Sequence, residues 1–382
     1  MKSQQVQVKD VTTLTAKLGT LTDVAKANLV LVFGAPGLLR ADSMFSQLKA
    51  ACPAAIIVGC STAGEITNAG IADETLVVTV AHFDKVALSF ASTDLKGMDD
   101  SEGAGRRLGA ILKDSKPRAV ILIGQGVNIN GSALINGLHA EIGDDIAITG
   151  GLAGDGARFQ ETMVVTPQGV STSAVVAVGL GGDALRFNHG SFGGWEPFGT
   201  LRKVTRAVDN VLFELDGTPA LDVYKQYLGD YAKDLPSSGL LFPFEMLNEA
   251  RSTTGVIRTI LAVDESTGSL TLAGDIDPNG YLQLMHASSD RLVDGAEAAA
   301  NAAKEMAAHP GGGIGLLVSC VGRKLVMGDR IDEEIEAVGD VFGQHTLLTG
   351  FYSYGEISPF APGAECRLHN QTMTVTWIAE AA

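Results

Sequence analysis

The sequence of 382 residues has few of the features that identify common protein classes. Only four cysteines occur, widely spaced and without a C-x-x-C pair, so neither a disulfide framework nor a zinc knuckle is predicted. The first residues, MKSQQVQVKD, lack the apolar stretch of a signal peptide, and no apolar run approaches the roughly 18 residues that cross a bilayer. The sequence therefore predicts a cytoplasmic protein with reduced thiols and no membrane-spanning segment.

Basic residues are also scarce. Lys and Arg number 28 against 44 Asp and Glu, which gives a formal net charge of −16. A surface of this sign repels phosphate backbones, because binding to nucleic acid depends on cationic side chains that displace counterions. Nucleic acid is therefore excluded as an expected partner.

Familiar catalytic and metal-binding motifs are missing. There is no Walker motif, G-x-G-x-x-G, H-E-x-x-H or EF-hand loop, and the seven histidines show no metal-ligand spacing. Ser61 stands in Gly-Cys-Ser-Thr-Ala, which is close to a nucleophile elbow but lacks its second glycine, and no histidine is placed by sequence to activate it. Cys60 and Cys320 are interpreted as inert core thiols. We therefore expect no enzyme, with a Ser61 hydrolase as the less favoured alternative.

The chain is rich in hydrophobic residues, at 46%, and in glycine, with 46 residues. Its length predicts two domains. Short apolar runs that end near glycine alternate with helical stretches, which is the pattern of an α/β fold. The runs lie at residues 29–33, 54–58, 119–123, 145–149, 314–318 and 346–349. Helices are expected at residues 42–51, 101–113, 132–142, 218–229, 289–308 and 332–342, and an antiparallel hairpin at 256–273.

One unit occurs three times: a strand, a helix, and a second strand that runs into a glycine-rich turn. The second strands end in Gly59-Cys-Ser-Thr-Ala-Gly-Glu65, Gly150-Gly-Leu-Ala-Gly-Asp155 and Gly350-Phe-Tyr-Ser-Tyr-Gly-Glu356. Because α/β sheets bind ligands at their strand ends, we expect these turns to enclose one shared pocket. The alternative stays open that the glycines only permit tight turns and the hydroxyls only cap helices.

Several of these segments together resemble the paired FIST N and FIST C domains. They are the three turns, Phe192-Gly-Gly-Trp-Glu-Pro-Phe-Gly199, Glu214-Leu-Asp-Gly217 and Cys320-Val-Gly-Arg323, in order between residues 25 and 380. The resemblance implies a signal-transduction input module that binds small ligands such as amino acids. It implies an α/β protein of two related domains with mixed sheets flanked by helices, with stacked αββα layers left open. The expected division is an N-terminal segment, 1–24, a FIST N-like domain, 25–217, and a FIST C-like domain, 218–382.

A FIST chain of this size also resembles the bacterial NosP type. That resemblance implies a haem cofactor, nitric oxide as the ligand, and control of a histidine kinase or cyclic-di-GMP enzyme in trans; a homodimer is left open. Under this hypothesis His369 is the expected axial ligand of the iron, with Arg367 paired to a propionate.

A haem-free sensor is the alternative hypothesis. Here the residues at the strand ends hold a small polar or amino-acid-like ligand. The candidate ligand-binding residues are Ser61, Thr62, Glu65, Asp155, Tyr354 and Glu356.

Overall fold

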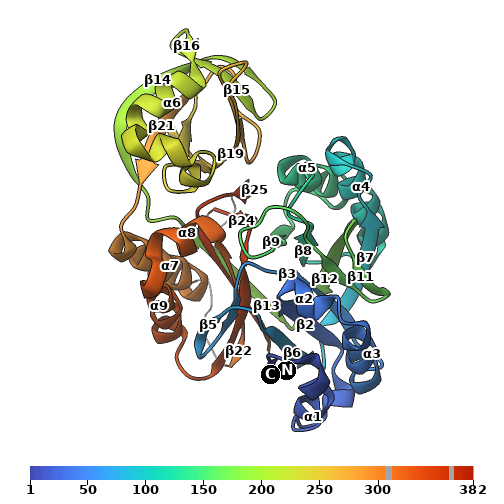
Figure 1. Cartoon of the computed structure of the whole chain (residues 1–382). Coiled ribbons are helices and arrows are strands. Elements are labelled where there is room, and N and C mark those ends of the chain that lie inside the picture. The colour runs from blue at the N-terminus through green and yellow to red at the C-terminus, as the bar shows by residue number, and fades with distance from the viewer. Residues whose placement is uncertain (306–311, 361–364, 382) are drawn as a thin grey trace.

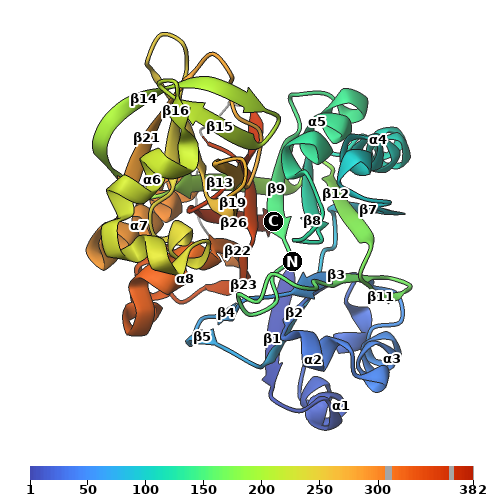
Figure 2. The ribbon, with the colours of Figure 1, turned by 45° about the horizontal axis from the view of Figure 1, so that its top comes forward.

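The computed structural model describes residues 1–305, 312–360 and 365–381. Three six-stranded sheets surround a common core, helices cover their outer faces, and a separate lobe stands above them (Figures 1 and 2). The expected α/β class with mixed, helix-flanked sheets is confirmed. Three sheets, rather than two stacked ones, form the body.

The body consists of three units with the same order of elements. Each has an edge strand, helical turns, a strand, further helix, a parallel strand, a short hairpin and a returning strand. Unit 1 contains β1 (Lys2–Val8), η1 (Val11–Thr13), α1 (Leu14–Leu18), η2 (Val24–Lys26), β2 (Leu29–Gly34), α2 (Pro36–Leu39), α3 (Asp42–Ala51), β3 (Ile56–Ser61), β4 (Glu65–Thr67), β5 (Gly70–Ala72) and β6 (Leu76–His82).

Units 2 and 3 repeat this order. Unit 2 contains β7 (Ala87–Asp94), η3 (Met98–Asp100), α4 (Ser101–Leu112), η4 (Lys113–Ser115), β8 (Ala119–Gly124), α5 (Gly131–Ile142), β9 (Ala147–Leu152), β10 (Val164–Thr166), β11 (Gly169–Ser171) and β12 (Ala174–Gly181). Unit 3 contains β13 (Leu185–Phe192), α7 (Ser289–Glu305), β22 (Gly313–Cys320), α8 (Val321–Met327), η7 (Gly328–Arg330), α9 (Asp332–Phe342), β23 (Thr346–Ser353), β24 (Gly355–Pro359), β25 (Cys366–His369) and β26 (Met373–Glu380). None of the described helices is long and apolar enough to cross a membrane.

The hairpins join the units into a ring. Within each unit the two central strands are parallel: β2 with β3, β8 with β9, and β22 with β23. The hairpin that follows them does not stay in its own sheet. The hairpin β4–β5 of unit 1 pairs with β23, β24–β25 of unit 3 pairs with β9, and β10–β11 of unit 2 pairs with β3. Each unit thus completes the sheet of another, and the exchange closes on itself.

A glycine at the same place in each unit allows the parallel strands to approach. Gly59, Gly150 and Gly350 stand in β3, β9 and β23, each opposite a residue of the neighbouring parallel strand. A Cβ at these positions would lie 1.7, 2.0 and 1.9 Å from the carbonyl oxygen of that residue. No other amino acid fits such a contact, so the repeat seen in the sequence reflects a steric requirement shared by all three units.

The sheets are buried on both faces. Side chains from β2, β8, β12, β22 and their neighbours meet in one central core. The opposite faces pack against the helices of their own units in three further clusters. This double burial explains why the central strands are continuous apolar runs without alternation.

The lobe is an insertion in unit 3, residues 193–287, between β13 and α7. It contains β14 (Glu196–Val208), β15 (Val211–Leu215), β16 (Thr218–Pro219), α6 (Ala220–Leu228), η5 (Gly229–Asp234), η6 (Ser237–Leu240), β17 (Phe244–Leu247), β18 (Thr253–Arg258), β19 (Ile260–Asp264), β20 (Ser269–Leu272) and β21 (Tyr281–His286). The lobe has its own hydrophobic core. The boundary expected between residues 217 and 218 lies inside it, between β15 and β16.

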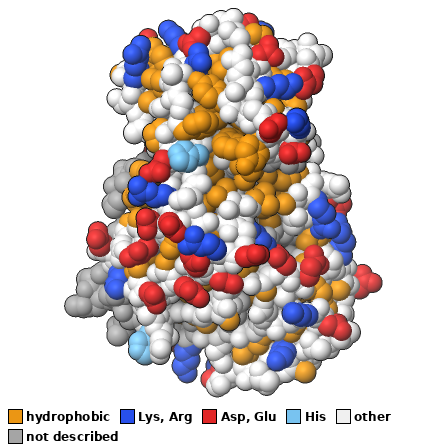
Figure 3. All heavy atoms as spheres, turned by 60° about the vertical axis from the view of Figure 1, so that its left-hand side comes forward, with side chains coloured by type: hydrophobic (Ala, Val, Ile, Leu, Met, Phe, Trp, Pro, Cys, Tyr) orange, Lys and Arg blue, Asp and Glu red, His pale blue; other side chains and the backbone are white. Residues whose placement is uncertain are grey.

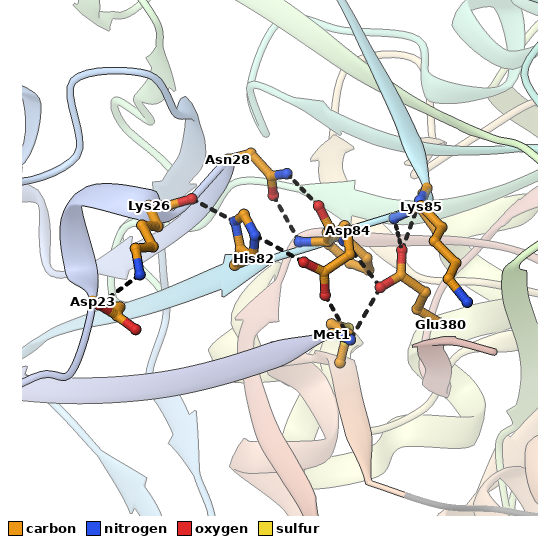
Figure 4. Close-up of polar contacts among 10 residues, drawn as sticks. Met1, Asp23, Lys26, Asn28, His82, Asp84, Lys85 and Glu380 are labelled. Carbon is orange, nitrogen blue, oxygen red and sulfur yellow. Dashed lines mark hydrogen bonds and ion pairs between the residues drawn. The ribbon is translucent and has the colours of Figure 1, made fainter. Parts of the chain in front are cut away.

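The two ends of the chain lie side by side in the lower part of the body (Figure 1), and Figure 4 shows the polar contacts there. The amino group of Met1 lies 3.0 Å from Oε2 of Glu380, at the end of β26. The same carboxylate accepts the backbone N–H groups of Asp84, Lys85 and Val86, which connect β6 to β7. Glu380 therefore joins units 1 and 3 and the link to unit 2 at one point.

Candidate functional site

The three glycine-rich turns converge, as the sequence predicts, but the first turn does not line the shared pocket that was also expected. A backbone N–H of each turn donates a hydrogen bond to a carbonyl of another turn. The bonds are Ala63 to Tyr352 (2.9 Å), Tyr354 to Leu152 (3.1 Å) and Gly154 to Ser61 (2.8 Å). The turns therefore form a closed ring of backbone hydrogen bonds at the centre of the body, where the three units meet.

The hydroxyls of the first turn are used inside this ring. Ser61 is fully buried, and its oxygen accepts the backbone N–H of Met163 at 2.8 Å. Thr62 is buried and donates to the carboxylate of Glu65. Ser61 and Thr62 therefore contact protein rather than an open pocket, and Ser61 is not presented as a nucleophile.

Glu65 is a buried carboxylate with polar but uncharged partners. It is 1% exposed, and its Oε2 accepts both the N–H of Thr75, at 3.1 Å, and the Thr75 hydroxyl, at 2.6 Å. Burial raises its pKa to about 7, against the opposing effect of the hydrogen bonds from Thr62 and Thr75.

Glu356 repeats this arrangement in unit 3. Its Oε1 accepts the Ser353 hydroxyl at 2.5 Å, and its Oε2 accepts the N–H and the hydroxyl of Thr372 at 3.1 and 3.0 Å. The side chain is fully buried, and burial raises its pKa to about 8. The sequence repeat thus identified two equivalent carboxylates, each placed by a hydroxyl three residues earlier.

Asp155 is not the third member of this set. In the sheets, Glu65 and Glu356 stand where unit 2 has Val164, which pairs with Cys60 of β3. Asp155 lies instead in a longer loop, residues 153–163, between β9 and β10. The sequence spacing placed an acid after the turn in each copy, but the extra length of this loop moves Asp155 to a different position.

Asp155 organises its own loop. Its two oxygens accept the backbone N–H groups of residues 158–161 at 2.8 to 3.1 Å, and Oδ1 also accepts the hydroxyl of Tyr354. Burial raises the pKa of Asp155, but the hydrogen bonds from Tyr354 and the loop outweigh it and lower the pKa below its usual value. The loop holds Phe159 against Tyr354, with ring centroids 4.2 Å apart and an interplanar angle of 18°.

An apolar groove opens beside this aromatic pair, between the lobe and the body. Its volume is about 680 Å³. Four of its lining side chains are large hydrophobic residues that stay 38 to 46% exposed: Met98, Phe159, Leu261 and Leu325. The rest of the lining includes Val127, Ile129, Leu152, Ala157, Arg158, Leu240, Ile260, Tyr354 and Leu368. On the face shown in Figure 3, hydrophobic side chains gather at the level where lobe and body meet.

Gln371 connects the lobe to the ring of glycine-rich turns. Its backbone has a φ of 64°, and its buried side-chain amide donates to the carbonyl of Leu240, at 2.8 Å, and to the hydroxyl of Thr259, at 3.1 Å. Its carbonyl accepts the indole N–H of Trp195 at 2.8 Å. The next residue, Thr372, holds Glu356. The sequence analysis missed Gln371, because nothing in its neighbourhood signals a left-handed backbone or a partner more than 100 residues away.

The residues proposed for haem do not fit that group. His369 is 1% exposed in β25, its Nε2 lies 2.9 Å from the carbonyl oxygen of Ser358, and it does not line the groove. Its Nδ1 has no hydrogen-bond partner among the described residues, but the imidazole is buried in β25, which pairs with β24, rather than facing an open site. Arg367 is exposed and pairs with Glu365. Within the described ranges, no group of three His, Cys, Asp or Glu side chains is arranged to hold a metal.

Comparison with protein families agrees with this architecture. Residues 28–218 match the FIST N domain, and residues 220–359 match the FIST C domain. The chain belongs to the FIST family. FIST domains are sensor domains of signal transduction that bind small ligands. The FIST C match ends at the last residue of β24 and covers most of the lobe, so the residues that line the groove, apart from Leu368, lie within the matched regions.

Other relatives add little to this assignment. An uncharacterized protein of Methanocaldococcus jannaschii is 25% identical over 223 residues, which are 55% of this FIST chain and 43% of that protein. The chain thus aligns with less than half the length of this curated relative. A crystal structure of cyanuric acid hydrolase from A. caulinodans is 11% identical with a TM-score of 0.35, covering 100% of this chain and 99% of that one. A second cyanuric acid hydrolase structure is 10% identical with a TM-score of 0.33, covering 99% of each chain. Scores this low do not support a comparison of activity.

Proposed function

We propose that this FIST protein senses a small, mainly apolar molecule that binds in the groove between lobe and body. The observation that carries the proposal is the concentration of exposed hydrophobic side chains there. Leu261 comes from the lobe, whereas Met98, Phe159 and Leu325 come from the body. These side chains are exposed, and a ligand that removes them from water gains about 25 cal/mol for each Å² of apolar surface buried.

A ligand in the groove would touch both parts of the molecule. The lobe is an insertion joined to the body through two chain segments and through buried contacts such as those of Gln371 and Trp195, and we propose that its orientation responds to binding. A ligand that contacts both sides favours the orientation in which both contacts are made. The position of the lobe is then the signal.

The ligand class differs from the polar or amino-acid-like one that the turn residues imply. Ser61, Thr62, Glu65 and Glu356 are buried and bonded to protein, whereas Tyr354 lines the groove and Asp155 positions its rim. Of the candidate residues, only this last pair serves an open site. A signalling protein in trans, of the histidine kinase or cyclic-di-GMP enzyme class that the NosP resemblance implies, is the proposed recipient of the signal.

The test uses Nile red, a neutral apolar dye, titrated into the full chain with fluorescence as the readout. Leu261→Asp places a charge in the groove and should weaken binding at least tenfold. Ile111→Asp is the matched control, because Ile111 is 53% exposed on α4 and does not line the groove. It should bind as the unchanged protein does.

Two results would contradict the proposal. Equal dye affinities of the two variants would show that the dye binds elsewhere. A Soret band that forms on addition of hemin and is lost in His369→Ala would establish the haem hypothesis in place of this one.

A further inference from the structure

Two arginines are buried in the described part of the molecule, with opposite surroundings. Arg323 is fully buried and pairs with the carboxylate of Glu334 at 2.7 Å. Arg258, at the end of β18 in the lobe, is 6% exposed and has only backbone acceptors. Its Nε lies 3.3 Å from the carbonyl oxygen of Asp275, and its Nη1 lies 3.0 Å from that of Leu368 in the body.

Arg258 has no directly paired carboxylate among the described residues, although the negative charge of Asp275 acts on it. It forms no ion pair with a described residue, and its Nη2 has no hydrogen-bond partner among them. The residues outside the described ranges contain no Asp or Glu. Burial lowers the pKa of Arg258 to about 10, with Asp275 opposing and Arg367 adding to the effect. The guanidinium is therefore a buried cation at neutral pH, and such a charge is costly unless an anion compensates it.

A cavity adjoins this cation. Arg258 lines a space of about 430 Å³ between the lobe and α5. Thr254 of the lobe and Ser132 and Asn136 of α5 supply hydroxyl and amide groups, while Met246 and Val256 supply apolar surface. Leu368 lines both this cavity and the groove. The cavity therefore combines an unsatisfied cation, polar donors and an apolar wall.

The guanidinium is held in place by close packing. A Cβ at Gly274 would lie 2.8 Å from Cζ of Arg258 and 3.1 Å from its Nη2. The planar group thus lies against the backbone of residue 274, which fixes the direction of its free N–H groups. A fixed guanidinium fork matches the two oxygens of a carboxylate.

We propose that this cavity binds the carboxylate of a small organic monoanion, with Arg258 as the residue that recognises it. The ligand is limited to a single negative charge, because Asp275, Asp277 and Glu365 line the cavity together with Arg258 and Arg367, and these three carboxylates repel a dianion. The site is separate from the groove, so it stands independently of the proposed function. Because Arg258 belongs to the lobe and α5 to the body, a bound carboxylate would hold the two together.

The experiment compares hexanoate with hexanamide by isothermal titration calorimetry on the full chain at pH 7. Hexanoate should bind at least tenfold more tightly, because the amide lacks the charge that Arg258 requires. Arg258→Gln should lose that preference. Arg186→Gln removes an equal charge from the exposed surface of β13, where Arg186 contacts only backbone carbonyls. This variant should keep the preference for hexanoate.

A second variant separates recognition from folding. Gly274→Ala keeps Arg258 but displaces its guanidinium, and it should weaken hexanoate binding tenfold while Nile red binding in the groove is retained. If Arg258→Gln loses cooperative unfolding, Gly274→Ala decides the question. Equal affinity for hexanoate and hexanamide, no binding of hexanoate to the unchanged protein, or full hexanoate affinity in Gly274→Ala would each overturn the proposal.

Discussion

Glu65 and Glu356 are carboxylates enclosed by the body with only hydroxyl and backbone N–H partners. Each donor favours the charged form, yet burial is the larger effect, and it raises both pKa values. The protein therefore holds two acids that take up protons near neutral pH. Both belong to the ring of turns that supports the groove.

Glu356→Gln tests whether this buried carboxylate takes up a proton near neutral pH. The unfolded pKa of a glutamate is about 4.3, and the folded pKa of Glu356 is about 8. The folded state therefore binds the proton more tightly, so this stabilisation is complete below pH 4 and is lost as the pH rises through 8. Glutamine does not titrate, so the variant does not lose this stabilisation. As the pH rises from 5 to 9, the free energy of unfolding of the variant should therefore increase by a few kcal/mol relative to that of the unchanged protein.

Urea denaturation at pH 5, 7 and 9 measures the difference. Glu249→Gln removes an equal charge from an exposed turn and is the matched control. A constant difference between Glu356→Gln and the unchanged protein across this range would mean that Glu356 is not protonated in the folded state.

Individual residues differ in how far the sequence could predict them. The repeated glycine-rich turn that ends in an acid identified Glu65 and Glu356, because this pattern lies within seven consecutive residues. Gln371 and Arg258 were not predicted. Their burial and partners depend on the lobe, whose position against β25 is decided by residues far away in the chain.

At the scale of elements, the loop 153–163 is the part of unit 2 that departs from the threefold pattern. Units 1 and 3 pass from the parallel strand to the hairpin within a few residues. Unit 2 instead has a loop that brings Phe159 to the rim of the groove. One carboxylate, that of Asp155, accepts four consecutive backbone N–H groups and so determines the shape of this loop.

Asp155→Ala should therefore disorder the loop. Four N–H groups and the Tyr354 hydroxyl lose their acceptor, which should reduce the free energy of unfolding by about 2 to 4 kcal/mol and weaken Nile red binding. Asp10→Ala removes a similar contact, to the N–H of Thr12, from the distant helical turn η1. It should cost about 1 kcal/mol and leave dye binding unchanged. Unchanged dye binding in Asp155→Ala would show that the loop does not form the site.

Secondary structure followed the sequence closely where local signals were strong. The apolar runs at 29–33, 119–123 and 314–318 became β2, β8 and β22, and the helix expected at 42–51 is α3. The hairpin expected at 256–273 is present as β19 and β20. The edge strands β1 and β13 were not predicted, because one is polar on its exposed face and the other is interrupted by glycine. The exchange of hairpins between sheets could not be predicted, because each hairpin pairs with a strand far away in the sequence and no local pattern records that partner.

At the scale of the molecule, a ring of three units carries a lobe inserted in the third. The ring is closed by hairpin exchange, by the backbone bonds among the turns and by Glu380 at the chain ends. The lobe contacts the body through Gln371 and through the bond from Arg258 to Leu368, and the groove lies where the two parts meet, so a ligand bound there can change the relation between them.

Hydrogen exchange measured by mass spectrometry, with and without saturating Nile red, tests this claim most directly. Exchange should become slower on both sides of the groove at once, in loop 153–163 of the body and in β19 of the lobe, with little change in the distant helices α1 and α3. Protection confined to one side, or found only away from the groove, would contradict it.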